Sequence, residues 1–158
     1  TAGHQLDLAE RAAGLCAVHG KRQRGRSILK RAFEHNQHDP QAWIAYATYI
    51  AIQQRDKLPE AFKILEESLE RFPQEPRIYG QLVNLHLSSD EWNEARDVIN
   101  RGLEQPSQSP DYWLRMAAIA ARVWIITDPS SHVVLNEIYG KARTLGKGQL
   151  HILSLIHI

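Results

Sequence analysis

Two histidines and an aspartate are the residues of this 158-residue chain whose types and spacing most suggest metal binding. His35, His38 and Asp39 lie close together, and imidazole and carboxylate groups are common ligands of zinc. The sequence offers no fourth ligand and no acid–base partner beside them, and Pro40 marks a helix boundary directly after them. We therefore interpret the three residues as an exposed polar helix terminus and predict no metal site.

Two further features have types suited to catalysis. Cys16, the only cysteine, lies at an apolar position of a helical pattern, where core packing is expected rather than a nucleophile. The stretch 146–148, Gly-Lys-Gly, lacks the preceding strand and the spacing of a phosphate-binding loop. The sequence therefore predicts no catalytic residue and no cofactor.

A basic cluster is the strongest local concentration of charge, Lys21-Arg22-Gln23-Arg24-Gly25-Arg26. Such a cluster could contact phosphate groups of nucleic acid or acidic lipid. It has no interleaved aromatic residues, and it falls on a turn and a helix start, where charge is usually solvated. The whole chain carries 19 Lys and Arg against 18 Asp and Glu, so nucleic acid is not the expected partner. No apolar run approaches the roughly 18 residues that span a bilayer.

The elements that must position these residues follow a repeated pattern. Pro40, Pro76 and Pro110 are 36 and 34 residues apart, and each precedes an aromatic residue by three positions. Apolar residues then recur at helical intervals, and a second helical run follows before the next proline. The pattern predicts an all-α domain over 1–152, built of antiparallel helix pairs in four repeats, 6–39, 40–75, 76–109 and 110–149.

The turns inside these pairs carry more specific expectations. In the third repeat, Ser89 or Asp90 is expected to cap the second helix. The second repeat has two extra residues in its turn, and the fourth has a longer insertion from Trp124 to Ser131. Ala47 is expected to face Ala61 where two helices cross, because a larger side chain would push the backbones apart.

The pattern resembles the tetratricopeptide repeat. The aromatic, small and apolar residues of the first helix match its first half, and the small residues and closing proline of the second helix match its second half. In the second repeat these residues are Trp43, Tyr46, Ala47 and Ile50, then Ala61, Leu65, Ser68 and Pro73. The runs 26–32 and 43–47 also look like half-a-TPR repeats of RNA-processing scaffolds, although the glutamate usual after the aromatic pair is replaced by Ile50-Ala51.

The resemblance implies a right-handed α-solenoid whose first helices line a concave face that binds a protein or peptide partner. The residues expected on this face are Gln41, Thr48, Arg77, Gln81, Asn84, Arg115 and Arg122. Asn84 occupies an asparagine position of the carboxylate clamp found in some members, but the clamp lysines are missing, so that clamp is not expected. Extended peptides and helices both suit such a groove.

Two alternatives to a protein-interaction scaffold stay open: an RNA-processing scaffold of half-a-TPR type, and an accessory repeat domain of an enzyme whose catalytic part lies elsewhere. The last six residues, 153–158, match one reading frame of a transposase sequencing adapter. We therefore expect a fragment of a longer protein with a translated adapter tail, which is left out of the fold prediction. The sequence leaves compartment and oligomeric state open.

Overall fold

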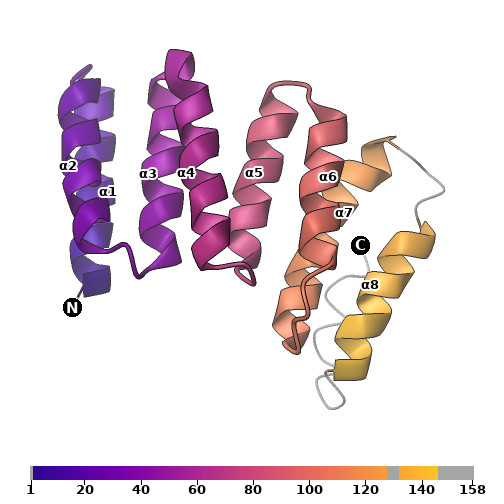
Figure 1. The fold of residues 1–158 in the computed structure, drawn as a ribbon. Coiled ribbons are helices and arrows are strands. Elements are labelled where there is room, and N and C mark those ends of the chain that lie inside the picture. The colour runs from indigo at the N-terminus through magenta and orange to yellow at the C-terminus, as the bar shows by residue number, and fades with distance from the viewer. Residues whose placement is uncertain (1, 128–131, 146–158) are drawn as a thin grey trace. The chain divides into compact units, whose positions relative to one another are not determined.

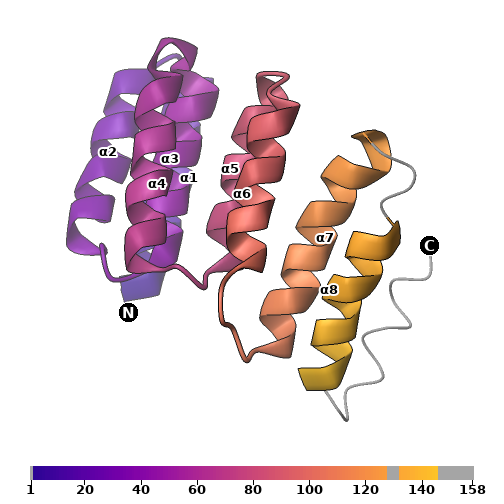
Figure 2. The same cartoon turned by 45° about the vertical axis from the view of Figure 1, so that its right-hand side comes forward.

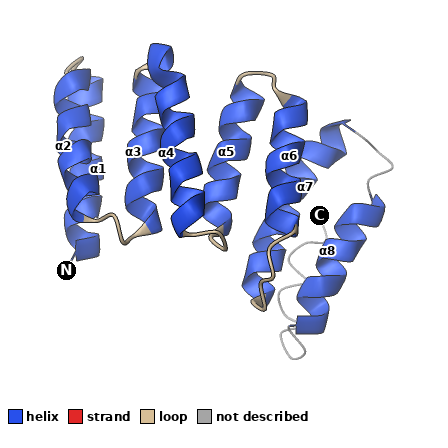
Figure 3. Ribbon diagram, viewed as in Figure 1, coloured by secondary structure: helices blue, strands red, loops and turns tan. Residues whose placement is uncertain are grey.

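The computed structural model describes residues 2–127 and 132–145, and all the regular secondary structure in that part is helical (Figures 1 and 3). This confirms the predicted all-α fold. The two stretches 146–148 and 153–158, singled out in the sequence, lie outside the described residues. No described helix is long and apolar enough to cross a membrane.

The helices fall into two compact units, Thr1–Phe72 and Pro73–Ile158, and each unit contains antiparallel helix pairs (Figure 2). The first unit contains α1 (Ala2–Val18), α2 (Arg22–His35), α3 (Pro40–Gln53), the 3₁₀ turn η1 (Arg55–Lys57) and α4 (Leu58–Arg71). The second unit contains α5 (Pro76–Ser88), α6 (Trp92–Leu103), α7 (Pro110–Thr127) and α8 (His132–Leu145).

The three prolines begin helices α3, α5 and α7, as the sequence predicts. Proline suits the first helical position because its missing N–H would have no partner there. In two of these helices an acidic side chain just before the proline accepts a backbone N–H. Asp39 accepts from Gln41, and Glu75 accepts from Arg77. Asp39 is therefore a helix cap, which accounts for its place beside the histidines.

Two expectations about the turns need correction. The N-cap of α6 is Glu91, without a side-chain cap bond, so neither Ser89 nor Asp90 caps the helix. Asp90 has a φ of 60°, which places it in the left-handed region, where it turns the chain between α5 and α6. The insertion that begins at Trp124 is partly helical, because α7 continues to Thr127.

Helices α3, α5 and α7 each carry an aromatic residue at the same position, and its side chain donates a hydrogen bond to the connection that precedes the helix. Trp43 Nε1 donates to the carbonyl of Gln37, and the Tyr79 hydroxyl donates to that of Pro73. Trp113 Nε1 donates in the same way to the carbonyl six residues earlier, at Ser107. These side chains are 2–4% exposed, so they are core residues. Tryptophan and tyrosine fit the position because they combine a large apolar ring with one polar group.

Arg26 links three elements of the first unit. Its guanidinium donates to the Tyr46 hydroxyl (3.4 Å), to Gln54 Oε1 (2.8 Å) and to Glu60. Burial opposes the charge of Arg26, but Tyr46 and Glu60 outweigh it and hold the pKa of Arg26 above its ordinary value. Arg26 therefore contributes to the packing of the first unit and is not a surface charge of the basic cluster seen in the sequence.

Replacing Arg26 by methionine is expected to lower the free energy of unfolding by about 1–3 kcal/mol, because three partially buried acceptors lose their donor. The matched control is Arg24→Met on the same helix, where the side chain is exposed. That change should stay within about 0.5 kcal/mol. Urea unfolding followed by circular dichroism measures both, and equal losses would contradict the assigned role of Arg26.

Candidate functional site

Helices α5 and α7 of the second unit pack against each other and carry most of the predicted partner-binding residues. Arg77, Gln81 and Asn84 are spaced four and three residues apart on α5, so they lie on one side of that helix. Gly80 lies on the same helix, and a Cβ built on it would be 3.4 Å from Ile119 Cδ1 of α7. The two helices therefore lie close together at Gly80, with polar groups along the seam.

A hydrogen bond across this seam joins two of the predicted residues. Arg122 Nη2 on α7 donates to Asn84 Oδ1 on α5. Arg122 is exposed and Asn84 is half-buried, so the bond lies at the surface and not in the core. It fixes which way the Asn84 amide points.

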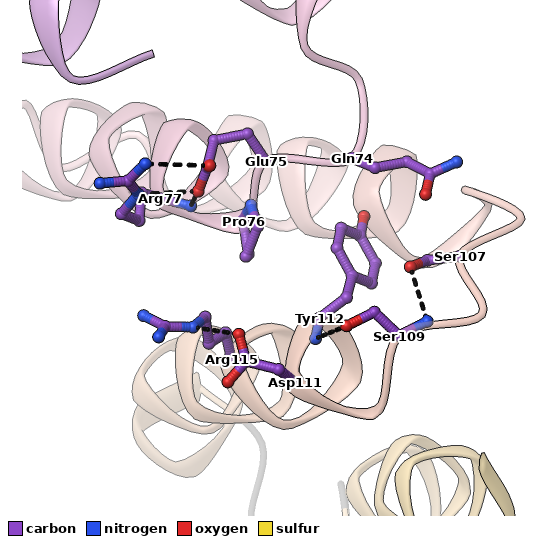
Figure 4. Close-up of a pocket in the computed structure, with 9 residues that line it drawn as sticks. All are labelled: Gln74, Glu75, Pro76, Arg77, Ser107, Ser109, Asp111, Tyr112 and Arg115. Carbon is purple, nitrogen blue, oxygen red and sulfur yellow. Dashed lines mark hydrogen bonds and ion pairs between the residues drawn. The ribbon is translucent and has the colours of Figure 1, made fainter. Parts of the chain in front are cut away.

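A pocket of about 400 Å³ lies where α5 and α7 begin (Figure 4). Arg77 and Arg115 line it, as do Glu75 and Asp111, which the sequence analysis did not select. Its other lining residues are Gln74, Pro76, Ser107, Ser109 and Tyr112. The sequence could have pointed to these two acids, because each is next to the proline that starts a helix and therefore lies at the same end of the helices as Arg77 and Arg115.

Each arginine of the pocket is paired with an acid at the start of its own helix. Arg77 Nε and Nη2 donate to the two carboxylate oxygens of Glu75 at 2.8 and 3.0 Å. Arg115 Nε donates to Asp111 Oδ2 at 2.7 Å. The charges of these four side chains cancel. The pocket therefore contains two ion pairs of fixed geometry and has no net charge from them.

The carboxylate of Glu75 is held ionised by its neighbours. Burial alone would raise the pKa of Glu75, but hydrogen bonds from the Arg77 side chain and backbone N–H and the charge of Arg115 lower it below its ordinary value. A carboxylate with a lowered folded-state pKa stabilises the fold at neutral pH. That contribution is lost as the pH falls through the folded-state pKa.

Glu75→Gln is therefore expected to cost about 0.5–1 kcal/mol of unfolding free energy at pH 7, from the lost cap charge and ion pair. The difference between wild type and variant should shrink as the pH falls below the ordinary glutamate pKa of about 4.3 and through the lower folded-state pKa of Glu75, because wild-type Glu75 is then protonated too. Urea midpoints measured from pH 7 to pH 3 test this. A difference that stays constant over that range would contradict the assignment.

The remaining predicted residues of the face belong to the first unit. Gln41 and Thr48 lie on α3, both half-buried, and Gln41 Nε2 donates to Glu10 Oε1 of α1 at 3.2 Å. This bond also joins two first helices of neighbouring pairs, as the Arg122–Asn84 bond does.

His35 and Cys16 are the other residues whose types suggested metal binding or catalysis. His35 Nδ1 lies 2.8 Å from the carbonyl oxygen of Arg31 on its own helix. Cys16 is half-buried on α1, so it is not the fully buried core residue that the sequence predicted. Among the described residues, no group of three or more His, Cys, Asp or Glu side chains is arranged to hold a metal ion.

Comparison with known families matches residues 53–119 to a model described as tetratricopeptide repeat. No curated protein matches the chain. Among the solved structures that match is one described as the MamA RS-1 ArsTM double mutant, with 14% sequence identity and a TM-score of 0.49. The match covers 92% of this chain and 78% of that one.

Proposed function

Residues 53–119 match a tetratricopeptide repeat model, and on that premise we propose that this chain is a scaffold that binds a protein segment on the α5–α7 face. The face is defined by its five polar side chains, Arg77, Gln81, Asn84, Arg115 and Arg122. An extended peptide or a helix laid along the seam would meet all five. Helix pairs of this kind typically serve as binding scaffolds and not as catalysts.

The observation that carries the proposal is the surface hydrogen bond between Arg122 and Asn84. Both residues lie on the outside of packed helices, where the core does not require them. Side chains already oriented before a partner arrives lose less conformational entropy on binding. A polar seam fixed in this way is suited to recognising backbone amides and polar side chains.

The pocket at the start of the two helices adds a place for a partner side chain. Its volume of about 400 Å³ lies within the range typical of ligand pockets. The alternating pairs Arg77–Glu75 and Arg115–Asp111 favour a polar group that both donates and accepts hydrogen bonds. A purely acidic or purely basic tail would meet one unfavourable charge for each favourable one.

A displayed library of random peptides, selected on the wild-type chain, tests this function. The affinity of selected peptides should fall by about tenfold or more in the double variant Asn84→Ala, Arg115→Ala. The matched control is Asn136→Ala, Arg143→Ala, which removes the same two side-chain types from exposed positions of α8. Retention of affinity in the first variant, or an equal loss in the control, would overturn the proposal.

A further inference from the structure

The outer side of α1 is apolar and exposed. Leu8 is 52% exposed and Leu15 is 62% exposed, and their seven-residue spacing places them on one side of the helix. Val18, 81% exposed, ends the same helix. The opposite side of α1 carries Leu6 and Ala13, which are 3% and 0% exposed. The helix therefore has apolar residues on two sides, and only one side is covered.

The equivalent positions of another first helix in the same unit are buried. Ala42 and Tyr49 of α3 lie 34 residues after Leu8 and Leu15, and they are 0% and 8% exposed. The Tyr49 hydroxyl donates to the carbonyl of Arg22 at 2.9 Å, so this side of α3 packs on α2, the second helix of the preceding pair. Helix α2 carries a buried glycine, Gly25, at that contact.

Helix α7 in the second unit repeats the arrangement. Tyr112 and Ile119 occupy the positions of Leu8 and Leu15, and they are 2% and 9% exposed. The Tyr112 hydroxyl donates to the carbonyl of Gly102 on α6 at 2.6 Å. Ile119 lies beside Gly80 of α5. In both units, this side of a first helix is the surface that stacks on the preceding helix pair.

The side chains on the outer face of α1 fit a stacking surface better than a solvent-facing end. Helices that cap a repeat array need a polar outer face to stay soluble, because no neighbour covers them. The outer face of α1 instead presents two leucines, with Arg11 between them on the same side of the helix, where it pairs with the exposed Asp7. Covering each leucine would remove a large apolar side chain from water.

We propose that a further helix pair of the same repeat type stacks on α1 and covers Leu8 and Leu15. The face, defined by Leu8, Leu15 and Val18, continues the interface that α3 makes with α2. The occupant presents a glycine or alanine at the contact, as α2 does with Gly25 and α6 with Gly102. This inference concerns the first unit and does not depend on the α5–α7 face.

The test replaces residues 1–5 with one consensus tetratricopeptide repeat followed by a copy of residues 36–39, which join α2 to α3 and lie 34 residues after 2–5. Hydrogen exchange of the α1 backbone amides is measured with and without the added repeat. Stacking should slow exchange in α1 by about tenfold or more, because opening α1 would re-expose two buried leucines. In the fused double variant Leu8→Glu, Leu15→Glu the protection should be lost.

Two controls keep the outcome interpretable. The double variant without the added repeat should keep the wild-type helix content, because both side chains already lie in water. Ile52→Glu, an exposed apolar position at the end of α3, should leave the protection of α1 unchanged in the fusion. Unchanged α1 exchange on fusion would overturn the proposal. So would concentration-dependent self-association of the unfused chain that the double variant abolishes, because the occupant would then be a second copy.

Discussion

Replacing Trp43 by alanine is expected to lower the free energy of unfolding by about 3–5 kcal/mol. The indole is 3% exposed and makes a T-shaped contact with the Phe33 ring at a centroid distance of 4.8 Å. Arg71 of α4 lies over its ring at 5.1 Å. Truncation therefore leaves a cavity bordered by α2 and α4, and it also removes the hydrogen bond to Gln37.

Urea unfolding of Trp43→Ala and Trp43→Phe separates the two contributions. Phenylalanine keeps an aromatic ring in the site and loses the N–H donor, so it should cost about 1–2 kcal/mol, less than alanine. A loss below about 1 kcal/mol for alanine would mean that the indole is not part of the core. In that case its place in the repeat would have to be explained by binding.

Replacing Gly25 by leucine is expected to destabilise the first unit by about 3 kcal/mol or more, because the contact between α1, α2 and α3 has no room for a side chain. A Cβ on Gly25 would lie 2.8 Å from the carbonyl oxygen of Ala13 and would also collide with the hydroxyl group of Tyr49. The backbone of α1 cannot move aside without disturbing the helix pair.

The matched substitution is Gly14→Leu on α1, where nothing lies within 4 Å of the added Cβ. This change should stabilise the chain by about 0.5–1 kcal/mol, because leucine is a better helix former than glycine. Thermal unfolding of the two variants should therefore shift in opposite directions. If Gly25→Leu also stabilised the chain, the close approach of the three helices would be wrong.

The sequence predicted the helix pairs well because their signals are local. A proline at the first helical position and an aromatic residue three positions later are read within one turn of helix, and the structure confirms both at Pro40, Pro76 and Pro110. The cap of α6 was mispredicted for an equally local reason. Aspartate favours both caps and left-handed turns, and Asp90 adopts the second.

The candidate site was only partly predictable because its contacts join distant residues. Repeat register placed Asn84 and Arg122 on the first helices, but their hydrogen bond spans 38 residues. The role of Arg26 was not predictable for the same reason, because its hydrogen-bond partners lie 20 to 34 residues away. In the sequence Arg26 looks like a surface charge, but in the structure it joins helices. Side-chain pairing between helices depends on the packing angle and distance, which sequence periodicity does not encode.

The most direct test of the proposed binding face is chemical-shift mapping of the labelled chain with a peptide selected on it. The account predicts that the largest backbone shifts cluster on α5 and α7, at Arg77, Gln81, Asn84, Arg115 and Arg122. The peptide should cause little change on α6, the second helix of the first pair in that unit. Shifts concentrated on α6, or on the first unit alone, would contradict the assignment of the α5–α7 face as the binding surface.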